Sequence, residues 1–132
     1  MQREILFRGA RICDGQFVNG SLVEVNGECS SNESAPHIVI SYGPDTFDWF
    51  EVEPETVGQF TGMTDKHGTK IFEGDILNEP SASKDDIYQV FWDECRFSFC
   101  AKNGYGEYYL DEMCQSICEV IGNIHDNKEL LK

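Results

Sequence analysis

Cysteine and histidine are the side chains of this chain that could supply a nucleophile, a general base or a metal ligand. The six cysteines and three histidines are Cys13, Cys29, Cys95, Cys100, Cys114, Cys118, His37, His67 and His125. Nucleophilic catalysis needs a Cys or Ser beside a His and an orienting acid. No local signature brings such a set together, so we predict no catalytic residues.

Metal binding is the other chemistry open to these side chains. The cysteine spacings C-x4-C and C-x3-C differ from the paired C-x2-C of zinc ribbons. His125 and Asp126 could join Cys114 and Cys118, because residues four apart on a strand share a face. However, Cys118 lies in a predicted strand, Ile117 to Ile124, and one face of that strand is expected to be core. We therefore predict no metal site and no cofactor.

The most patterned stretch, "TGMTDKHGTKIFEGDIL", runs from Thr61 to Leu77 and could be a metal loop, a phosphate loop or a turn. A calcium loop centred on Gly68 would put Met63 and Gly74 at its first and last ligand positions, and neither side chain chelates calcium. A phosphate loop needs G-x4-G-K-[ST], whereas Thr and Lys follow Gly68 in the reverse order. Both of these interpretations fail.

A turn remains as the interpretation of this stretch. The segment from Asp65 to Gly68 fits a type I turn in which Asp65 bonds its own backbone and Gly68 takes a positive φ. Gly74 then marks a bulge or a close backbone contact inside the predicted strand Lys70 to Leu77. We therefore predict a structural role for the whole stretch.

The net charge of −14 excludes some partners. It repels phosphate backbones and anionic membranes, so we expect no direct nucleic-acid binding and no membrane binding. No Lys or Arg lies between Arg11 and Lys66, an interval with ten Asp or Glu residues. This segment is either a solvated acidic face or a docking surface for a basic partner.

The N-terminus "MQREILFRGA" lacks the apolar core of a signal peptide, and no run is long enough to span a membrane. We therefore expect a cytoplasmic protein. In a reducing cytosol an even number of cysteines does not imply disulfides, so we predict six free thiols.

The predicted elements make the chain mainly β, with little helix. The first half contains a hairpin with a two-residue turn at Asp14-Gly15, further strands at His37 to Tyr42 and Thr46 to Glu53, and one helical turn that begins at Pro54. The second half contains five predicted strands: Lys70 to Leu77, Ile87 to Asp93, Arg96 to Ala101, Glu107 to Leu110 and Ile117 to Ile124.

Five short strands with tight turns favour a small SH3-like barrel, because closure removes exposed strand edges. A helical turn near the C-terminus is expected to dock Leu130 and Leu131. We predict an N-terminal β-rich lobe at residues 1–60, built around β-hairpins, and a C-terminal small β-barrel lobe at residues 61–132.

The run "FDWF" places Phe47 and Trp49 on one face of a strand and Asp48 and Phe50 on the other. Aromatic side chains on both faces indicate either burial on both sides or contact with a partner. Phe47, Trp49 and Phe50 are therefore candidate binding residues, with a core role as the alternative. Since one small core can hardly cover both faces, we predict a homo-oligomer.

Four segments together resemble the bacteriophage YopX-like proteins. They are "REILFRGARI", "EVEPETVGQFTG", "TGMTDKHGTKIFEGDIL" and "CEVIGNIHDNKELL", in that order along the chain. The resemblance implies a small cytosolic protein encoded by a phage or prophage. It implies no activity and no site residues.

Three hypotheses of function follow. The first is a non-enzymatic module that binds proteins or assembles with itself, because the chain is acidic, aromatic and without a site motif. The second is an acidic mimic of nucleic acid that binds a basic host or phage protein, because the long interval after Arg11 has no cation. The third is a small enzyme whose site only folding assembles.

Overall fold

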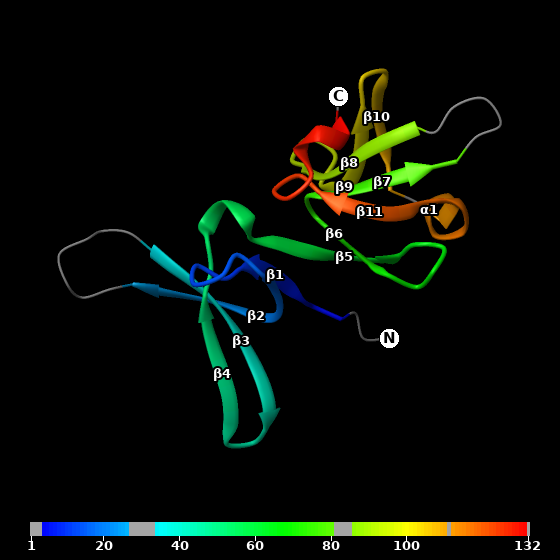
Figure 1. Cartoon of the computed structure of the whole chain (residues 1–132). Helices are drawn as coiled ribbons and strands as arrows, with labels where there is room; N and C mark the ends of the chain where they lie inside the picture. The colour runs from blue at the N-terminus through cyan, green and yellow to red at the C-terminus, as the bar shows by residue number, and fades with distance from the viewer. Residues whose placement is uncertain (1–3, 27–33, 81–85, 111, 132) are drawn as a thin grey trace. The chain divides into compact units, whose positions relative to one another are not determined.

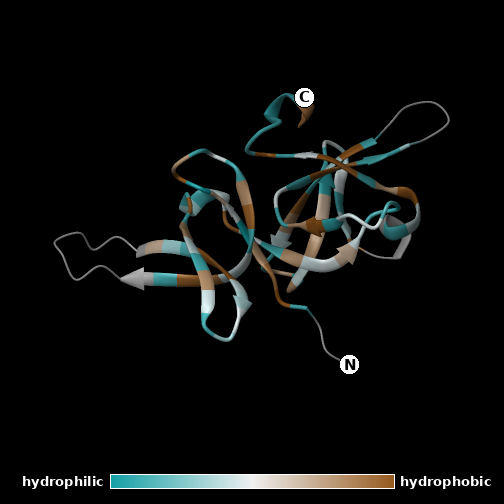
Figure 2. Ribbon diagram, turned by 60° about the horizontal axis from the view of Figure 1, so that its bottom comes forward, coloured by the Kyte–Doolittle hydropathy of each residue, from teal (hydrophilic) through white to brown (hydrophobic). Residues whose placement is uncertain are grey.

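The computed structural model describes residues 4–26, 34–80, 86–110 and 112–131, which divide into two compact units, Met1–Gln59 and Phe60–Lys132. Both units consist mainly of antiparallel strands (Figure 1), which confirms the predicted mainly-β class. Apolar and polar segments alternate along several of the strands (Figure 2), as expected where one face of a sheet is buried. Among the described residues, no helix has the length and apolar character needed to cross a membrane.

The first unit is built on strands that pair in the order β4-β3-β2-β1-β5. Its elements are β1 (Phe7–Ala10), β2 (Phe17–Asn26), β3 (Ser34–Gly43), β4 (Thr46–Glu51), the 3-10 turn η1 (Pro54–Thr56) and the start of β5 (Gly58–Thr64). Pro54 lies in the first turn of η1, as predicted, because its fixed φ suits that position.

The β1–β2 connection differs from the predicted two-residue turn. The Arg11 amide donates to the Gln16 carbonyl at 2.9 Å, and the Gly15 amide donates to the Arg11 carbonyl at 2.7 Å, so the loop spans residues 12–15. Gly15 does take a positive φ, at +74°. The Asp14 carboxylate accepts from the Gln16 amide at 3.0 Å and stabilises this longer loop.

The buried apolar side chains of the first unit include Ala10 of β1, Ile38 of β3 and Val52, which follows β4. Ile38 and Val52 are fully buried, and Val52 forms a bridge with Arg11. A Cβ on Gly9 would lie 2.8 Å from the Val52 side chain, so only glycine allows this close approach. The bridge brings the chain that follows β4 back beside the chain that follows β1.

The second unit contains a five-stranded antiparallel sheet in the order β10-β9-β8-β7-β11. Its elements are the end of β5, β6 (Lys70–Phe72), β7 (Asp75–Glu79), β8 (Asp86–Asp93), β9 (Ser98–Asn103), β10 (Gly106–Tyr109), α1 (Glu112–Ile117), β11 (Glu119–Asn123) and the 3-10 turn η2 (Lys128–Leu131). Ile71, Leu77, Val90 and Cys118 form its buried core cluster. Cys118 is thus a core side chain.

The sheet of the second unit is open rather than a closed barrel. Among the described residues β10 pairs only with β9, and β11 pairs only with β7. The segment between these two edge strands forms α1, a short helix that the sequence patterns did not predict. The chain turns from one edge to the other through this helix, so the SH3-like barrel that we predicted is not closed.

The predicted strand from Lys70 to Leu77 is two strands, β6 and β7, joined by a tight turn. Gly74 has φ +91°, and the Asp75 carboxylate accepts from the Phe72 amide at 2.8 Å. These two local features reverse the chain. Gly74 is therefore more than a bulge, and its amide donates to the Val90 carbonyl at 2.9 Å, which ties the turn to β8.

Candidate binding surface on the β3–β4 hairpin

The three candidate binding residues all lie on β4, in the hairpin that β4 forms with β3. The register pairs Phe47 with Ser41, Trp49 with Val39 and Phe50 with Ile38. Phe47 and Trp49 therefore share one face of the hairpin and Phe50 lies on the other, as strand alternation requires. The hairpin extends away from the rest of the first unit (Figure 1).

Phe47 and Trp49 form an aromatic pair on their shared face. Their ring centroids are 5.6 Å apart with an interplanar angle of 64°, and the His37 ring lies 6.1 Å from the Trp49 ring. Phe47 is 50% exposed and Trp49 is 49% exposed. We call the surface formed by Phe47, Trp49 and His37 the aromatic face.

Phe50 has a different environment from the other two candidates. It lies opposite the fully buried Ile38, and the Arg11 guanidinium carbon is 5.2 Å from the centroid of its ring. This cation–π contact and its partial burial place Phe50 at the base of the hairpin. The structure therefore brings together Phe47 and Trp49 but not Phe50.

Tyr42 is an exposed aromatic residue of the hairpin that the sequence reasoning did not single out. It is 62% exposed near the β3–β4 turn. A hydrogen bond to the Asp48 carboxylate raises the pKa of the Tyr42 hydroxyl, and burial and the Asp48 charge add to the effect. The strand alternation of "HIVISY" places Tyr42 on the same face as Ile38 and Ile40. This alternation is the sequence signal that could have identified Tyr42.

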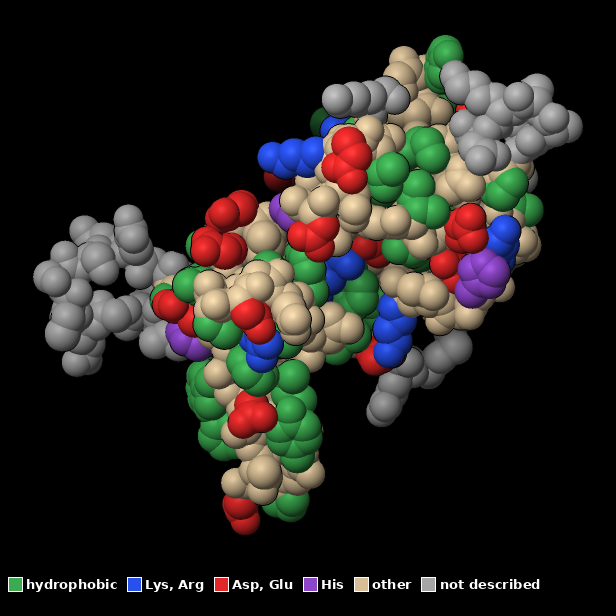
Figure 3. All heavy atoms as spheres, viewed as in Figure 1, with side chains coloured by type: hydrophobic (Ala, Val, Ile, Leu, Met, Phe, Trp, Pro, Cys, Tyr) green, Lys and Arg blue, Asp and Glu red, His purple; other side chains and the backbone are tan. Residues whose placement is uncertain are grey.

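The hairpin combines aromatic rings with negative charge. Asp45, Asp48 and Glu51 are exposed, and no Lys or Arg occurs between Arg11 and Lys66. Figure 3 shows hydrophobic side chains on both sides of the projecting hairpin, with acidic groups among them. Such a surface suits contacts with apolar or cationic groups.

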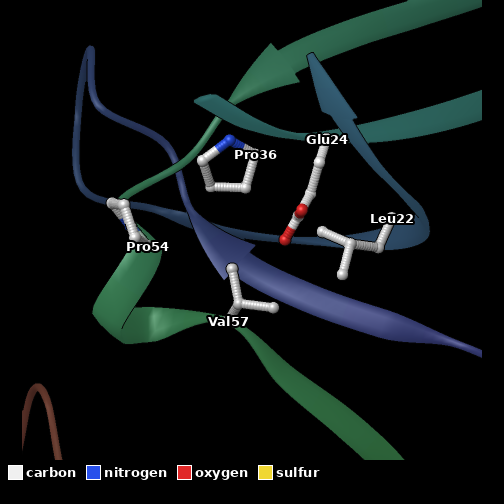
Figure 4. A pocket seen from close by; sticks show the side chains of 5 residues that line it. All are labelled: Leu22, Glu24, Pro36, Pro54 and Val57. Carbon is white, nitrogen blue, oxygen red and sulfur yellow. The ribbon is translucent and has the colours of Figure 1, made fainter. Parts of the chain in front are cut away.

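A shallow hollow of about 330 Å³ lies beside the base of the hairpin in the first unit. It is lined by Leu22, Glu24, Pro36, Pro54 and Val57. Figure 4 shows the Glu24 carboxylate pointing into the hollow between apolar side chains. Among the residues that the structure describes, none of the others lining the hollow is titratable, so these residues do not form the paired groups of an acid–base site.

The turn at Asp65 has the structure that its sequence predicts. The Gly68 amide donates to the Asp65 carbonyl at 3.0 Å, and Gly68 has φ +82°. One Asp65 carboxylate oxygen accepts from the His67 and Thr69 amides, and the other accepts from the Val120 amide, each at 2.9 Å. Burial would raise the pKa of Asp65, but the three amide donors outweigh burial and lower that pKa. The Asp65 carboxylate therefore binds three backbone amides, and its role is structural.

The remaining candidates for chemistry are the cysteines, the histidines and a metal site. Among the described residues, no three side chains of His, Cys, Asp or Glu are placed to hold one metal ion. Cys13 and Cys95 are exposed free thiols, Cys100 is a buried one and Cys118 lies in the core cluster, while the side chains of Cys29 and Cys114 lie outside the described residues. His67 contacts Glu119 at 3.2 Å, and this contact lowers the pKa of Glu119.

Comparison with known proteins gives a family and a fold. No curated protein matches the chain. A solved structure described as protein EF1440 from Enterococcus faecalis is similar, with a TM-score of 0.58 and 24% identity, over 99% of this chain and 100% of that one. This likeness supports the fold alone. The family model described as YopX protein matches residues 6–132, nearly the whole length. The chain therefore belongs to the YopX protein family.

Proposed function

We propose that the protein is a non-enzymatic, protein-binding module that self-associates through the aromatic face of its β3–β4 hairpin. The observation that carries the proposal is the pair of half-exposed rings of Phe47 and Trp49, stacked edge to face on a projecting hairpin. In keeping with the resemblance to bacteriophage proteins, the proposed setting is a phage or prophage product in the cytoplasm of its host.

A second copy suits this face because the only β4 carboxylate on it is that of Glu51, at the end of the strand. Asp48 and its partner Tyr42 lie on the opposite face, and Glu51 is paired in register with His37. Two aromatic faces can therefore pack together without burying the Asp48 carboxylate, which would be costly. Closed symmetric contacts of this kind are the commonest in homo-oligomers.

Sedimentation velocity at low and high salt tests self-association. We expect an oligomer that Trp49→Glu converts toward monomer with the fold retained, because the new charge enters the packed face. Tyr105→Glu is the matched control, since Tyr105 is 82% exposed in the β9–β10 turn of the other unit. A wild-type monomer at every concentration and salt would reject the proposal.

A second candidate function is binding to a basic partner, as an acidic mimic of nucleic acid. The observation that favours it is the absence of Lys and Arg between Arg11 and Lys66, an interval that includes the hairpin. Binding driven by such charge weakens as salt rises. Self-association through aromatic rings is expected to strengthen instead, so salt dependence separates the two candidates.

A further inference from the structure

β4 forms an outer edge of its sheet. Among the described residues, no further strand pairs with the backbone N–H and C=O groups on that edge. Within the described part of the chain, β4 is the last strand in its sheet and pairs only with β3. The Val52 amide donates to the Pro36 carbonyl at 3.1 Å, so the backbone N–H of Val52 points toward β3. The Glu51 carbonyl points the other way, where it accepts from the Ile12 amide at 3.0 Å.

Backbone direction alternates along an antiparallel strand. Trp49 and Phe47 therefore direct their N–H and C=O groups outward, on the same side as Glu51. In the described ranges, the Ile12 contact covers the edge at Glu51, outside the stretch from Thr46 to Phe50. The edge from Thr46 to Phe50 is thus a template for one more short strand.

The side chains around this edge indicate which strand would fit. Natural sheets protect their edges with charged residues, especially lysine. This edge has no lysine and instead has Asp48 on one face, the aromatic pair and Glu51 on the other, and Asp45 in the adjoining turn. A second copy of β4 would set acidic groups against acidic groups, which is unfavourable in cross-strand pairs.

Cationic side chains would suit both the acidic groups and the aromatic rings of this edge. Arginine and lysine pair with carboxylates and also stack on aromatic rings. The same unit already contains such stacking, since the Arg8 guanidinium carbon lies 5.0 Å from the Phe17 ring centroid and that of Arg11 lies 5.2 Å from the Phe50 centroid. Phe47 and Trp49 are comparable rings on the β3–β4 hairpin. The sequence from Ile12 to Asp65, which contains them, has no Lys or Arg that could stack on them.

We propose that the β4 edge, Thr46 to Phe50, binds an extended cationic segment of a partner protein as an added β-strand. This inference rests on the second candidate function and specifies its partner and its mode of binding. It differs from self-association in its hydrogen-bonding site, because the backbone edge lies in the plane of the sheet, while both proposals use the rings of Phe47 and Trp49.

Isothermal titration calorimetry with a synthetic peptide of alternating Arg and Val tests the proposal. Trp49→Pro removes an outward N–H without removing a bond to β3, while Trp49→Val keeps that N–H and also lacks the indole. We expect Trp49→Pro to bind about tenfold more weakly than Trp49→Val. Equal binding by the two variants would overturn the proposal.

Two further comparisons need no proline variant, should Trp49→Pro fail to fold. A peptide N-methylated at alternate residues keeps its charges but cannot pair with an edge, and we expect it not to bind measurably. Asp48→Asn should weaken binding of the unmodified peptide and reduce its salt dependence, whereas Asp126→Asn, the same charge change in the other unit, should not. Undiminished binding of the methylated peptide, or equal effects of the two Asn variants, contradicts the edge as the site.

Sedimentation velocity on the same samples separates this inference from the proposed self-association. A monomer that binds the peptide rejects packing of the aromatic faces and supports the edge site. An oligomer that does not bind the peptide supports packing of the aromatic faces and rejects the edge site. If neither peptide binding nor self-association is measured, both proposals fail.

Discussion

At the scale of single residues, Gly68 shows how a backbone conformation constrains one position. Its φ is +82°, and a Cβ built there would meet no atom within 4 Å. Any cost of substitution is therefore backbone strain alone. We expect Gly68→Val to destabilise the fold by about 1–2 kcal/mol, and Gly68→Asn by much less, because Asn tolerates this region. Thermal unfolding of both variants checks this, and equal melting temperatures would contradict the turn.

Asp65 links the turn to β11, 55 residues away in sequence, through the Val120 amide. Asp65→Ala removes the acceptor of three backbone donors and should cost at least about 2 kcal/mol at neutral pH. The folded-state pKa is lowered, so the carboxylate stabilises the fold above its unfolded pKa of about 3.9 and loses this effect as pH falls through the folded value. Urea unfolding at several pH values should show the gap between wild type and Asp65→Ala narrowing in acid.

The exposed Asp45 offers the control for this pH experiment. Asp45→Ala changes the same charge without removing an observed backbone contact, so its unfolding should follow that of the wild type at each pH. If the gap between wild type and Asp65→Ala stayed constant down to strongly acidic pH, the carboxylate would not be the group responsible.

The cysteines also make a prediction at this scale. Six free thiols should react under denaturing conditions without reductant, because neither the compartment expected for the protein nor the spacing favours bridges. In the folded protein Cys13 and Cys95 should react quickly, while Cys100 and Cys118 should react only on unfolding, because they are buried. Thiol titration in both states measures this. Finding two or fewer thiols after unfolding, without air oxidation, would refute it.

At the scale of elements, the β3–β4 hairpin depends on how β2 packs beside it. A Cβ on Gly20 of β2 would lie 2.4 Å from the Val39 carbonyl oxygen, a backbone atom that cannot move alone. Gly20→Ala should therefore destabilise the first unit by about 1–3 kcal/mol. Gly43→Ala is the matched control, since a Cβ there meets nothing within 4 Å. Chemical denaturation compares the two, and similar midpoints would show that β2 can shift away from Val39.

At the scale of the whole molecule, the net charge of −14 governs how association responds to salt. Copies repel one another at low ionic strength, and screening confines this repulsion to about 8 Å at physiological salt. Self-association through apolar rings should therefore tighten as salt rises. Sedimentation equilibrium at increasing salt measures it. Weaker association at high salt would point to ion pairs in place of the aromatic face.

The sequence by itself determined the features that depend on a few neighbouring residues. The turn from Asp65 to Gly68, the helical turn at Pro54 and the alternation of Phe47 and Trp49 on one face all follow from local backbone preferences and strand period. The mainly-β class and family membership are confirmed for the same reason, because they rest on patterns spread along the chain.

The tertiary structure decided what depends on contacts between distant residues. It split Lys70 to Leu77 into two strands, left the sheet of the second unit open with α1 between its edge strands, and placed Arg11 over the ring of Phe50. It also brought the Val120 amide to Asp65. Strand period and turn chemistry state which face a residue occupies, but not which distant donor, ring or strand will meet it, because that depends on the packing of the folded chain.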